Sequence, residues 1–136
     1  MRTLVVGGSG FIGYNLVLSL YEVDYHVAVV DKVLRKFTEL NLSQYGIDLH
    51  DDIALDKVFE IEKPQMVYYL VTSNVDYPDS EDVYHYVNLD VLGLVRTLHK
   101  CKKYNVEKII FVSSFDISYD DCADCMHRNR YTIPNM

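Results

Sequence analysis

A doubly wound α/β fold with a parallel sheet of about five strands is predicted by two features of the sequence. Short apolar segments alternate along the chain with segments whose apolar residues recur at helical spacing, and a glycine cluster directly follows the first apolar segment. The chain has 136 residues, of which 49% are hydrophobic and 24% charged, so it is long enough to form one domain with its own core.

The first half of the chain predicts three strands and two helices. Residues 2–6 form an apolar strand that ends at the glycines, and residues 26–31 form a second strand rich in valine. Between them, residues 12–20 carry an apolar side chain at every fourth position, which indicates one face of a helix. A third strand is expected at residues 45–49, and residues 51–62 suit a short helix that ends before a proline.

The second half predicts two more strands and the longest helix. Residues 65–71 are almost continuously apolar, as expected of a strand covered by helices on both sheet faces, and residues 107–113 form a fifth strand. Residues 115–136 lack periodicity, so we expect one domain at residues 1–114 and an irregular tail at 115–136. The helix at residues 83–104 is expected to turn one apolar stripe toward the core: Tyr84, Val87, Val91, Leu94 or Val95, Leu98 and Cys101.

Charge and length exclude several classes of partner. The formal net charge of −7 disfavours nucleic acid and anionic membrane surfaces, since both are held through clustered Lys and Arg. The first strand begins directly after Met1, which leaves no room for a signal peptide, and no apolar run has the length of a membrane span. We therefore expect a cytoplasmic protein without a nucleic-acid or membrane partner, whose three cysteines stay thiols.

The glycine cluster predicts a phosphate-binding turn. Gly7, Gly10 and Gly13 have the spacing Gly-x-x-Gly-x-x-Gly between a strand and a helix, where glycines permit a tight turn and a close approach to a pyrophosphate. The start of the helix, at Phe11 and Ile12, would present backbone amides to the phosphates. The same glycines could instead serve only the sharp turn from strand to helix. No Lys-Ser or Lys-Thr follows them, which excludes a Walker-type loop.

Asp31 supports the nucleotide interpretation. It closes the second strand, where Rossmann folds place an acidic residue that accepts hydrogen bonds from the adenosine ribose. A carboxylate there repels a 2′-phosphate, which favours NAD over NADP, although the nearby Lys32 and Arg35 leave NADP open. Asp31 could also be only a turn residue at the end of a strand.

With these features the chain resembles the extended short-chain dehydrogenase/reductases, which include NAD-dependent epimerases and dehydratases and 3β-hydroxysteroid dehydrogenases. Residues 7–13 look like the family's Gly-Gly-x-Gly-Phe-Ile-Gly, residues 88–93 are similar to its Asn-Val-x-Gly-Thr region, and residues 106–114 to its Gly-Val-Lys-x-x-Val-x-x-Ser-Ser strand. The resemblance implies that Asp48 and Leu49 line the adenine pocket and that residues 69–72 lie beside the nicotinamide half. The cofactor-binding residues implied by turn, strand and resemblance together are Gly7, Gly10, Phe11, Ile12, Gly13, Asp31, Asp48, Leu49, Leu70, Val71 and Asn88.

The resemblance also implies a catalytic group, but only part of it is found. Ser114 aligns with the Ser or Thr that contacts the reacting substrate oxygen, or it simply ends a buried strand. The family's Tyr-x-x-x-Lys pair is expected a couple of dozen residues later, beyond Met136. The spacing of Tyr104 and Lys108 imitates this pair, but it precedes the fifth strand and so belongs to the wrong edge of the sheet. We expect a Rossmann domain that is truncated relative to the family and lacks catalysis on its own.

Three residues of the tail permit a metal interpretation. Cys122 and Cys125 have the Cys-x-x-Cys spacing of a zinc half-site, and His127 could add a third ligand. A closed structural site needs a fourth ligand, so we expect free thiols and no metal.

Two further hypotheses remain open beside NAD binding. In the family this long helix packs against its counterpart in a dimer, so residues 83–104 could serve a homo-oligomer or a partner subunit, and the chain would then be a non-catalytic interaction or regulatory subunit. The chain could also be one fragment of a split NAD-dependent epimerase or dehydrogenase.

Overall fold

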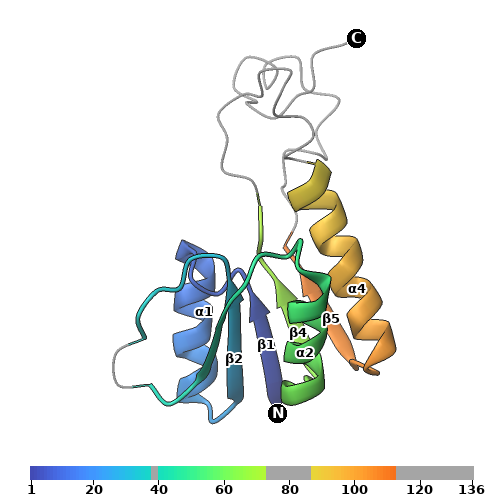
Figure 1. Ribbon diagram of the computed structural model, residues 1–136. Helices are drawn as coiled ribbons and strands as arrows, with labels where there is room; N and C mark the ends of the chain where they lie inside the picture. The colour runs from blue at the N-terminus through green and yellow to red at the C-terminus, as the bar shows by residue number, and fades with distance from the viewer. Residues whose placement is uncertain (38–39, 73–86, 113–136) are drawn as a thin grey trace, which may run out of the picture.

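The computed structural model, which describes residues 1–37, 40–72 and 87–112, shows a five-stranded parallel sheet between two layers of helices (Figure 1). The strand order is β3-β2-β1-β4-β5, and all four pairings are parallel. The elements are β1 (Arg2–Val6), α1 (Phe11–Glu22), β2 (His26–Asp31), β3 (Ser43–Gly46), α2 (Asp52–Glu62), β4 (Met66–Tyr69), η1 (Val87–Leu92), α4 (Gly93–Lys103) and β5 (Lys108–Phe111). The predicted doubly wound α/β class is confirmed.

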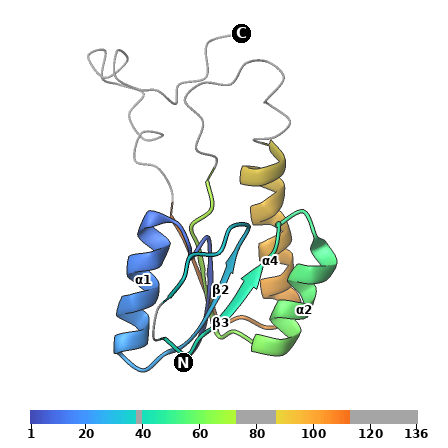
Figure 2. The ribbon, with the colours of Figure 1, turned by 60° about the vertical axis from the view of Figure 1, so that its left-hand side comes forward.

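Both faces of the sheet are buried. Successive side chains of a strand point to opposite faces, so Leu4 and Val6 of β1 enter one core while Val5 enters the other. The helix α1 covers the Val5 face with Val17 and Leu20, and α2 and α4 lie together over the opposite face (Figure 2). This double coverage explains why the central strands β1 and β2 are apolar without alternation.

The third and fourth strands end earlier than the sequence predicts. The third lies at Ser43–Gly46 rather than residues 45–49, because a polar turn takes over the backbone: Asp51 N donates to Asp48 O over 2.9 Å, and His50 N to Asp48 Oδ1 over 3.0 Å. The fourth stops at Tyr69 because its neighbour β1 ends at Val6, the register partner of Tyr69.

The long helix turns only part of its predicted apolar stripe to the core, because Cys101 is buried there and Leu94 packs against it, while other residues of the stripe are exposed. Val91 and Val95 are each 52% exposed, whereas Gly93, Thr97 and Lys100 are buried. Gly93 allows the close approach, since a Cβ there would lie 3.0 Å from the hydroxyl of Tyr69. The described part of the long helix begins with the π-helical η1. Residues 83–86 of the predicted range 83–104 lie outside the described residues.

A buried lysine joins the two helices on this face. Lys100 is 4% exposed, and its Nζ lies 2.8 Å from Asp52 and 3.2 Å from Asp56, while Lys103 reaches Asp56 at 2.8 Å. Burial on its own lowers the pKa of Lys100, but the hydrogen bonds to the two carboxylates raise it overall. Lys100 is therefore held charged between α4 and α2 by two carboxylates, beside the predicted apolar stripe.

Cys101 is a buried thiol, and burial raises its pKa to about 11. Cys122, Cys125 and the rest of the predicted tail at 115–136 lie outside the described residues. In the described ranges, no helix is both long and apolar enough to pass through a membrane.

Candidate functional site

The turn after β1 requires glycine at two of its positions, Gly7 and Gly13. Gly7 adopts a φ of +85°, which turns the chain off the sheet, while its amide still donates to Val30 O of β2 over 2.8 Å. A Cβ at Gly13 would lie 2.2 Å from the carbonyl oxygen of Gly7, so α1 can start this close to the turn only with glycine there. At Gly10 the nearest atom would be 3.4 Å away, which leaves the space in front of the turn open.

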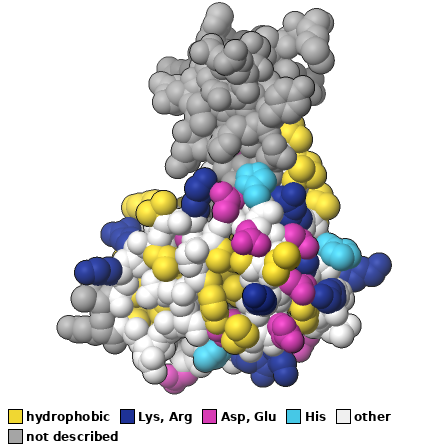
Figure 3. All heavy atoms as spheres, viewed as in Figure 1, with side chains coloured by type: hydrophobic (Ala, Val, Ile, Leu, Met, Phe, Trp, Pro, Cys, Tyr) yellow, Lys and Arg dark blue, Asp and Glu magenta, His cyan; other side chains and the backbone are white. Residues whose placement is uncertain are grey.

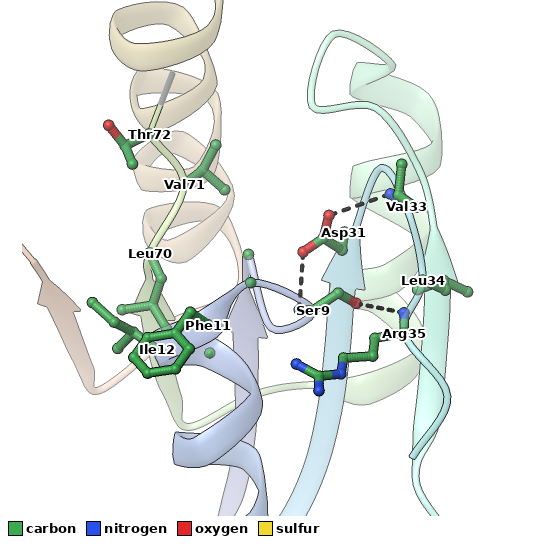
Figure 4. A pocket seen from close by; sticks show the side chains of 13 residues that line it. Ser9, Phe11, Ile12, Asp31, Val33, Leu34, Arg35, Leu70, Val71 and Thr72 are labelled. Atoms are coloured by element: carbon green, nitrogen blue, oxygen red, sulfur yellow. Dashed lines mark hydrogen bonds between the residues drawn. The ribbon is translucent and has the colours of Figure 1, made fainter. Parts of the chain in front are cut away.

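A cleft of about 740 Å³ opens in front of this turn (Figure 4). It lies at the carboxyl ends of β1, β2 and β4, where the strand order reverses and open α/β sheets bind their ligands. The start of α1 borders it with two strongly exposed apolar side chains, Phe11 at 84% and Ile12 at 58%. The lining residues are Gly7, Ser9, Gly10, Phe11, Ile12, Gly13, Asp31, Val33, Leu34, Arg35, Leu70, Val71 and Thr72.

Asp31 stands at the mouth of the cleft and is tied to both neighbouring loops. Its Oδ2 accepts a hydrogen bond from Ser9 N over 2.9 Å, and its Oδ1 accepts one from Val33 N over 3.3 Å. A carboxylate offers about four lone-pair sites, so each oxygen retains acceptor capacity for a ligand hydroxyl. The carboxylate is thus held in place by the backbone and still able to bind.

Arg35 forms the outer wall beside Ser9. Its backbone amide donates to Ser9 Oγ over 3.1 Å, and its guanidinium lies 3.8 Å from the centre of the Tyr14 ring, which stacks in turn on Phe37 at 4.9 Å. The loop after β2 is therefore joined to the glycine turn and to α1 by contacts within the protein itself.

A smaller cavity of about 180 Å³ adjoins the cleft and shares Asp31, Val71 and Thr72 with it. Asp48 and Leu49 line it, together with Val6, Val30, Lys32 and Ile47.

Three groups hold the Asp48 carboxylate in this cavity. Asp48 Oδ1 accepts from His50 N over 3.0 Å and lies 2.6 Å from His50 Nδ1, while Lys32 Nζ reaches Oδ2 at 3.1 Å. These contacts, the backbone amide of His50 first, lower the pKa of Asp48 to about 2. Asp48 is therefore a fixed negative charge at the edge of this cavity.

The structure brings together most of the residues that the sequence analysis singled out. Eight of them border the cleft and two the smaller cavity: Gly7, Gly10, Phe11, Ile12, Gly13, Asp31, Leu70 and Val71, then Asp48 and Leu49. Whether they bind a cofactor remains a prediction.

The other predicted residues cannot be placed in this group. Asn88 belongs to η1, and its side chain lies outside the described residues, as do Ser114, Cys122, Cys125 and His127 in full. The described ranges contain no group of three His, Cys, Asp or Glu that could hold a metal ion.

Tyr104 and Lys108 lie away from the cleft. Tyr104 is the C-cap of α4 and packs against Phe59 of α2 at 5.9 Å, and Lys108 is the first residue of β5. Their spacing is therefore unrelated to the carboxyl edge of the sheet, as the sequence analysis predicts.

Sequence reasoning missed Ser9 as a site residue. Its amide and its hydroxyl make the two hydrogen bonds that connect the glycine turn to Asp31 and to the loop after β2. A serine between the glycines of such a turn was the available signal, since a small hydroxyl there can accept from a neighbouring backbone amide.

The model of the NAD dependent epimerase/dehydratase family matches residues 3–134. The UDP-glucose 4-epimerase of Schizosaccharomyces pombe is 30% identical over 132 residues, which cover 86% of this chain and 36% of that protein. The Bifunctional protein GAL10 of Pachysolen tannophilus is 29% identical over 127 residues, which cover 86% of this chain and 18% of that protein. The chain thus spans well under half the length of these relatives.

Two solved structures of UDP-glucose 4-epimerases match the chain over a similarly small part of their own length. The UDP-glucose 4-epimerase of Thermus thermophilus in complex with NAD aligns with a TM-score of 0.76 at 30% identity, covering 84% of this chain and 38% of that one. The UDP-glucose 4-epimerase of Thermotoga maritima with UDP-glucose aligns with a TM-score of 0.75 at 31% identity and the same two coverages. Because the family model matches residues 3–134 of 136, the chain belongs to the NAD dependent epimerase/dehydratase family.

Proposed function

We propose that this chain binds NAD through the cleft in front of the glycine turn. One observation carries the proposal: the Asp31 carboxylate is fixed at the mouth of that cleft, 2.9 Å from the amide of Ser9 in the turn itself. A phosphate-binding turn and a ribose-binding carboxylate are therefore held together in a single unit. The Thermus thermophilus relative, whose structure contains NAD, supports the choice of cofactor.

Each part of NAD has a matching surface in this proposal. The pyrophosphate lies on the amides at the start of α1, where the helix dipole favours negative charge. Asp31 accepts from the adenosine ribose hydroxyls, and Asp48 and Leu49 border the adenine in the smaller cavity. Leu70 and Val71 face the nicotinamide half. The family resemblance adds Asn88 of η1 as a further cofactor-binding residue.

Catalysis needs groups beyond the cleft. Within the family resemblance, Ser114 contacts the reacting oxygen of the substrate, and a Tyr-x-x-x-Lys pair performs the proton transfer. We therefore propose residues 1–114 as the nucleotide-binding domain and expect chemistry only where such a pair is supplied, as it would be in a split NAD-dependent epimerase or dehydrogenase.

Isothermal titration calorimetry of the full chain with NAD tests the proposal. We expect saturable binding of NAD, competition by 5′-AMP, and no binding of nicotinamide mononucleotide, which lacks the adenosine that Asp31 and Asp48 would contact. Absence of heat from NAD and of competition by 5′-AMP at millimolar concentration would contradict it, because the dissociation constant would then exceed about 1 mM and the binding free energy would be weaker than about 4 kcal/mol.

A second candidate function is self-association through α4, favoured by one observation. Four apolar side chains follow one another along η1 and α4 and are each 42–52% exposed: Val87, Val91, Val95 and Leu98. Figure 3 shows apolar side chains gathered along the η1 end of this helix. Such a stripe fits the matching stripe of a second copy of the chain.

Sedimentation velocity tests this second candidate. We expect a dimer that dissociates in Val95→Glu, while Lys102→Glu, an exposed change on the same helix, leaves the dimer intact. A monomer at all concentrations would contradict self-association and leave the NAD proposal standing.

A further inference from the structure

Arg96 connects α4 to the turn that precedes α2, the helix beside it in Figure 2. Its Nη1 donates to the carbonyl oxygen of Leu49 over 3.3 Å, in a partly buried contact. Gly93, three residues earlier on the same face of α4, makes room for the side chain of Leu49, since a Cβ there would lie 3.3 Å from Leu49 Cδ1. The helix therefore contacts Leu49 through both its backbone and its side chain.

This contact reaches the wall of the smaller cavity. Leu49 and its neighbour Asp48 line that cavity, which receives the adenine in the proposed binding mode. Among the described residues, those that line the cleft and the smaller cavity do not include Arg96. Arg96 can therefore act on a bound nucleotide only through the turn that it holds.

Two hydrogen bonds within the turn set its shape but not its place. Asp51 N donates to Asp48 O over 2.9 Å, and His50 N donates to Asp48 Oδ1 over 3.0 Å. Both bonds move with the turn, because donor and acceptor belong to the same four residues. The place of the turn relative to the sheet depends on its contacts with other elements.

Two cations from other elements make polar contacts with the turn, and that of Arg96 is better shielded from water. Lys32 lies 3.1 Å from Asp48, but its side chain is 70% exposed, so solvent weakens the pair. Leu49 is only 5% exposed, and a buried carbonyl that loses a charged donor is costly to the fold. Arg96 is therefore the stronger polar connection between the turn and the rest of the domain.

The Asp48 carboxylate can recognise the base when the turn is held in place. It offers about four lone-pair sites, of which contacts with His50 and Lys32 occupy three. The remaining site can accept a hydrogen bond from the 6-amino group of adenine. Hypoxanthine has an oxygen at this position, as guanine does, and this oxygen would be repelled by the carboxylate.

We propose that Arg96 is a positioning residue that holds the turn of Asp48 and Leu49 where it selects adenine over hypoxanthine. The inference rests on the proposed NAD site. It assigns to α4, through Leu49 O, a part in base recognition without any contact between Arg96 and the nucleotide.

The test is the ratio of two dissociation constants, that of nicotinamide hypoxanthine dinucleotide over that of NAD, measured by calorimetry in the full chain. We expect a ratio of about ten in the unchanged chain, the size of one hydrogen bond to a charged group. In Arg96→Met, which keeps an apolar stem without the donor, we expect the ratio to fall to about two or less. A general loss of structure would weaken both dinucleotides alike and leave this ratio unchanged.

Two further variants complete the comparison. Arg96→Lys keeps one charged donor for the single contact with Leu49 O and should restore most of the ratio. Lys102→Met removes a positive charge from an exposed position of the same helix and should keep the ratio of the unchanged chain. Circular dichroism of each variant ensures that the compared chains are folded.

The outcomes separate this inference from the proposed function. Equal ratios in Arg96→Met and Lys102→Met overturn the role of Arg96 and leave the NAD site standing. A ratio near one in the unchanged chain does the same, because the turn would then not recognise the base. Failure of NAD itself to bind overturns the inference and the NAD site together.

Discussion

The backbone amide of Ser9 donates a hydrogen bond to the carboxylate of Asp31 over 2.9 Å, and this contact joins the glycine turn to the end of β2. The two residues are 22 positions apart in sequence, yet they meet because β1 and β2 are parallel neighbours whose last paired residues are Val6 and Val30. Asp31 therefore has a structural role within the fold in addition to its proposed role with ribose.

Asp31→Asn separates these two roles. The amide oxygen of Asn can still accept from Ser9 N, while the negative charge toward the ribose is lost. We expect NAD affinity to fall by about 10- to 100-fold, since hydrogen bonds to a charged group contribute ~1.5–3 kcal/mol. Calorimetry checks the affinity, and Asp24→Asn, an exposed carboxylate with a φ of 58° that Asn also tolerates, is the matched control. Equal affinities in the two variants would remove Asp31 from the site.

Two glycine substitutions distinguish folding from binding. Gly13→Ala drives a methyl group to within 2.2 Å of the Gly7 carbonyl oxygen, so we expect a loss of at least ~1–3 kcal/mol in the free energy of unfolding. Gly10→Ala meets its nearest atom at 3.4 Å, so the fold tolerates the methyl group, which projects instead toward the proposed pyrophosphate position. In urea unfolding, Gly13→Ala should therefore lose more stability than Gly10→Ala. In the NAD titration, Gly10→Ala should lose affinity although it stays folded. Tight NAD binding by Gly10→Ala would show that the phosphates do not lie on this turn.

The sequence was sufficient for those features that depend on local pattern. Apolar runs with helices between them predict a parallel sheet, and the spacing of Gly7, Gly10 and Gly13 predicts a turn whose need for glycine the structure explains at Gly7 and Gly13. Asp31 was found because a strand ends there at a known distance from the turn. Each of these signals is carried by residues close together in the chain.

The buried face of α4 could not be predicted in the same way. Of the predicted stripe, Leu94 and Cys101 reach the core, yet Val91 and Val95, which have the same helical spacing, are half exposed. Two contacts decide which face of α4 is buried. Tyr69 lies beneath Gly93, and Lys100 pairs with Asp52 and Asp56, which lie 48 and 44 residues earlier in the chain. Periodicity counts apolar residues along one helix and is insensitive to such distant partners.

The ion cluster between α2 and α4 predicts a specific acid sensitivity. The hydrogen bond from Lys103, followed by that from Lys100, lowers the pKa of Asp56 from 3.8 to about 2. Because this pKa is lower in the folded chain than in the unfolded chain, the stabilisation is fully present above about pH 4 and is lost as the pH falls toward 2. We expect the Tm to fall across this window, and to fall less steeply in Asp56→Asn. Thermal melts followed by circular dichroism measure both slopes.

Lys103→Met tests the same ion pair by changing the partner of Asp56. It removes the first cause of the lowered pKa of Asp56, so its Tm should also depend less on pH between about 4 and 2. If both variants kept the slope of the unchanged chain, the acid sensitivity would have to come from other carboxylates, such as Asp48, whose pKa is also lowered to about 2.

The end of α2 predicts a stabilising substitution. Lys63 is the C-cap of this helix and adopts a φ of 43°, a left-handed conformation in which a Cβ is crowded and glycine is not. The contacts of this position are made by the backbone, because Lys63 N donates to Phe59 O and Lys63 O accepts from Arg2 Nε, so glycine preserves them. We expect Lys63→Gly to increase the free energy of unfolding by ~0.5–1 kcal/mol in urea. Lys57→Gly makes the same replacement at an exposed position within α2 and should reduce it by ~1 kcal/mol, so that equal effects would rule out strain at Lys63.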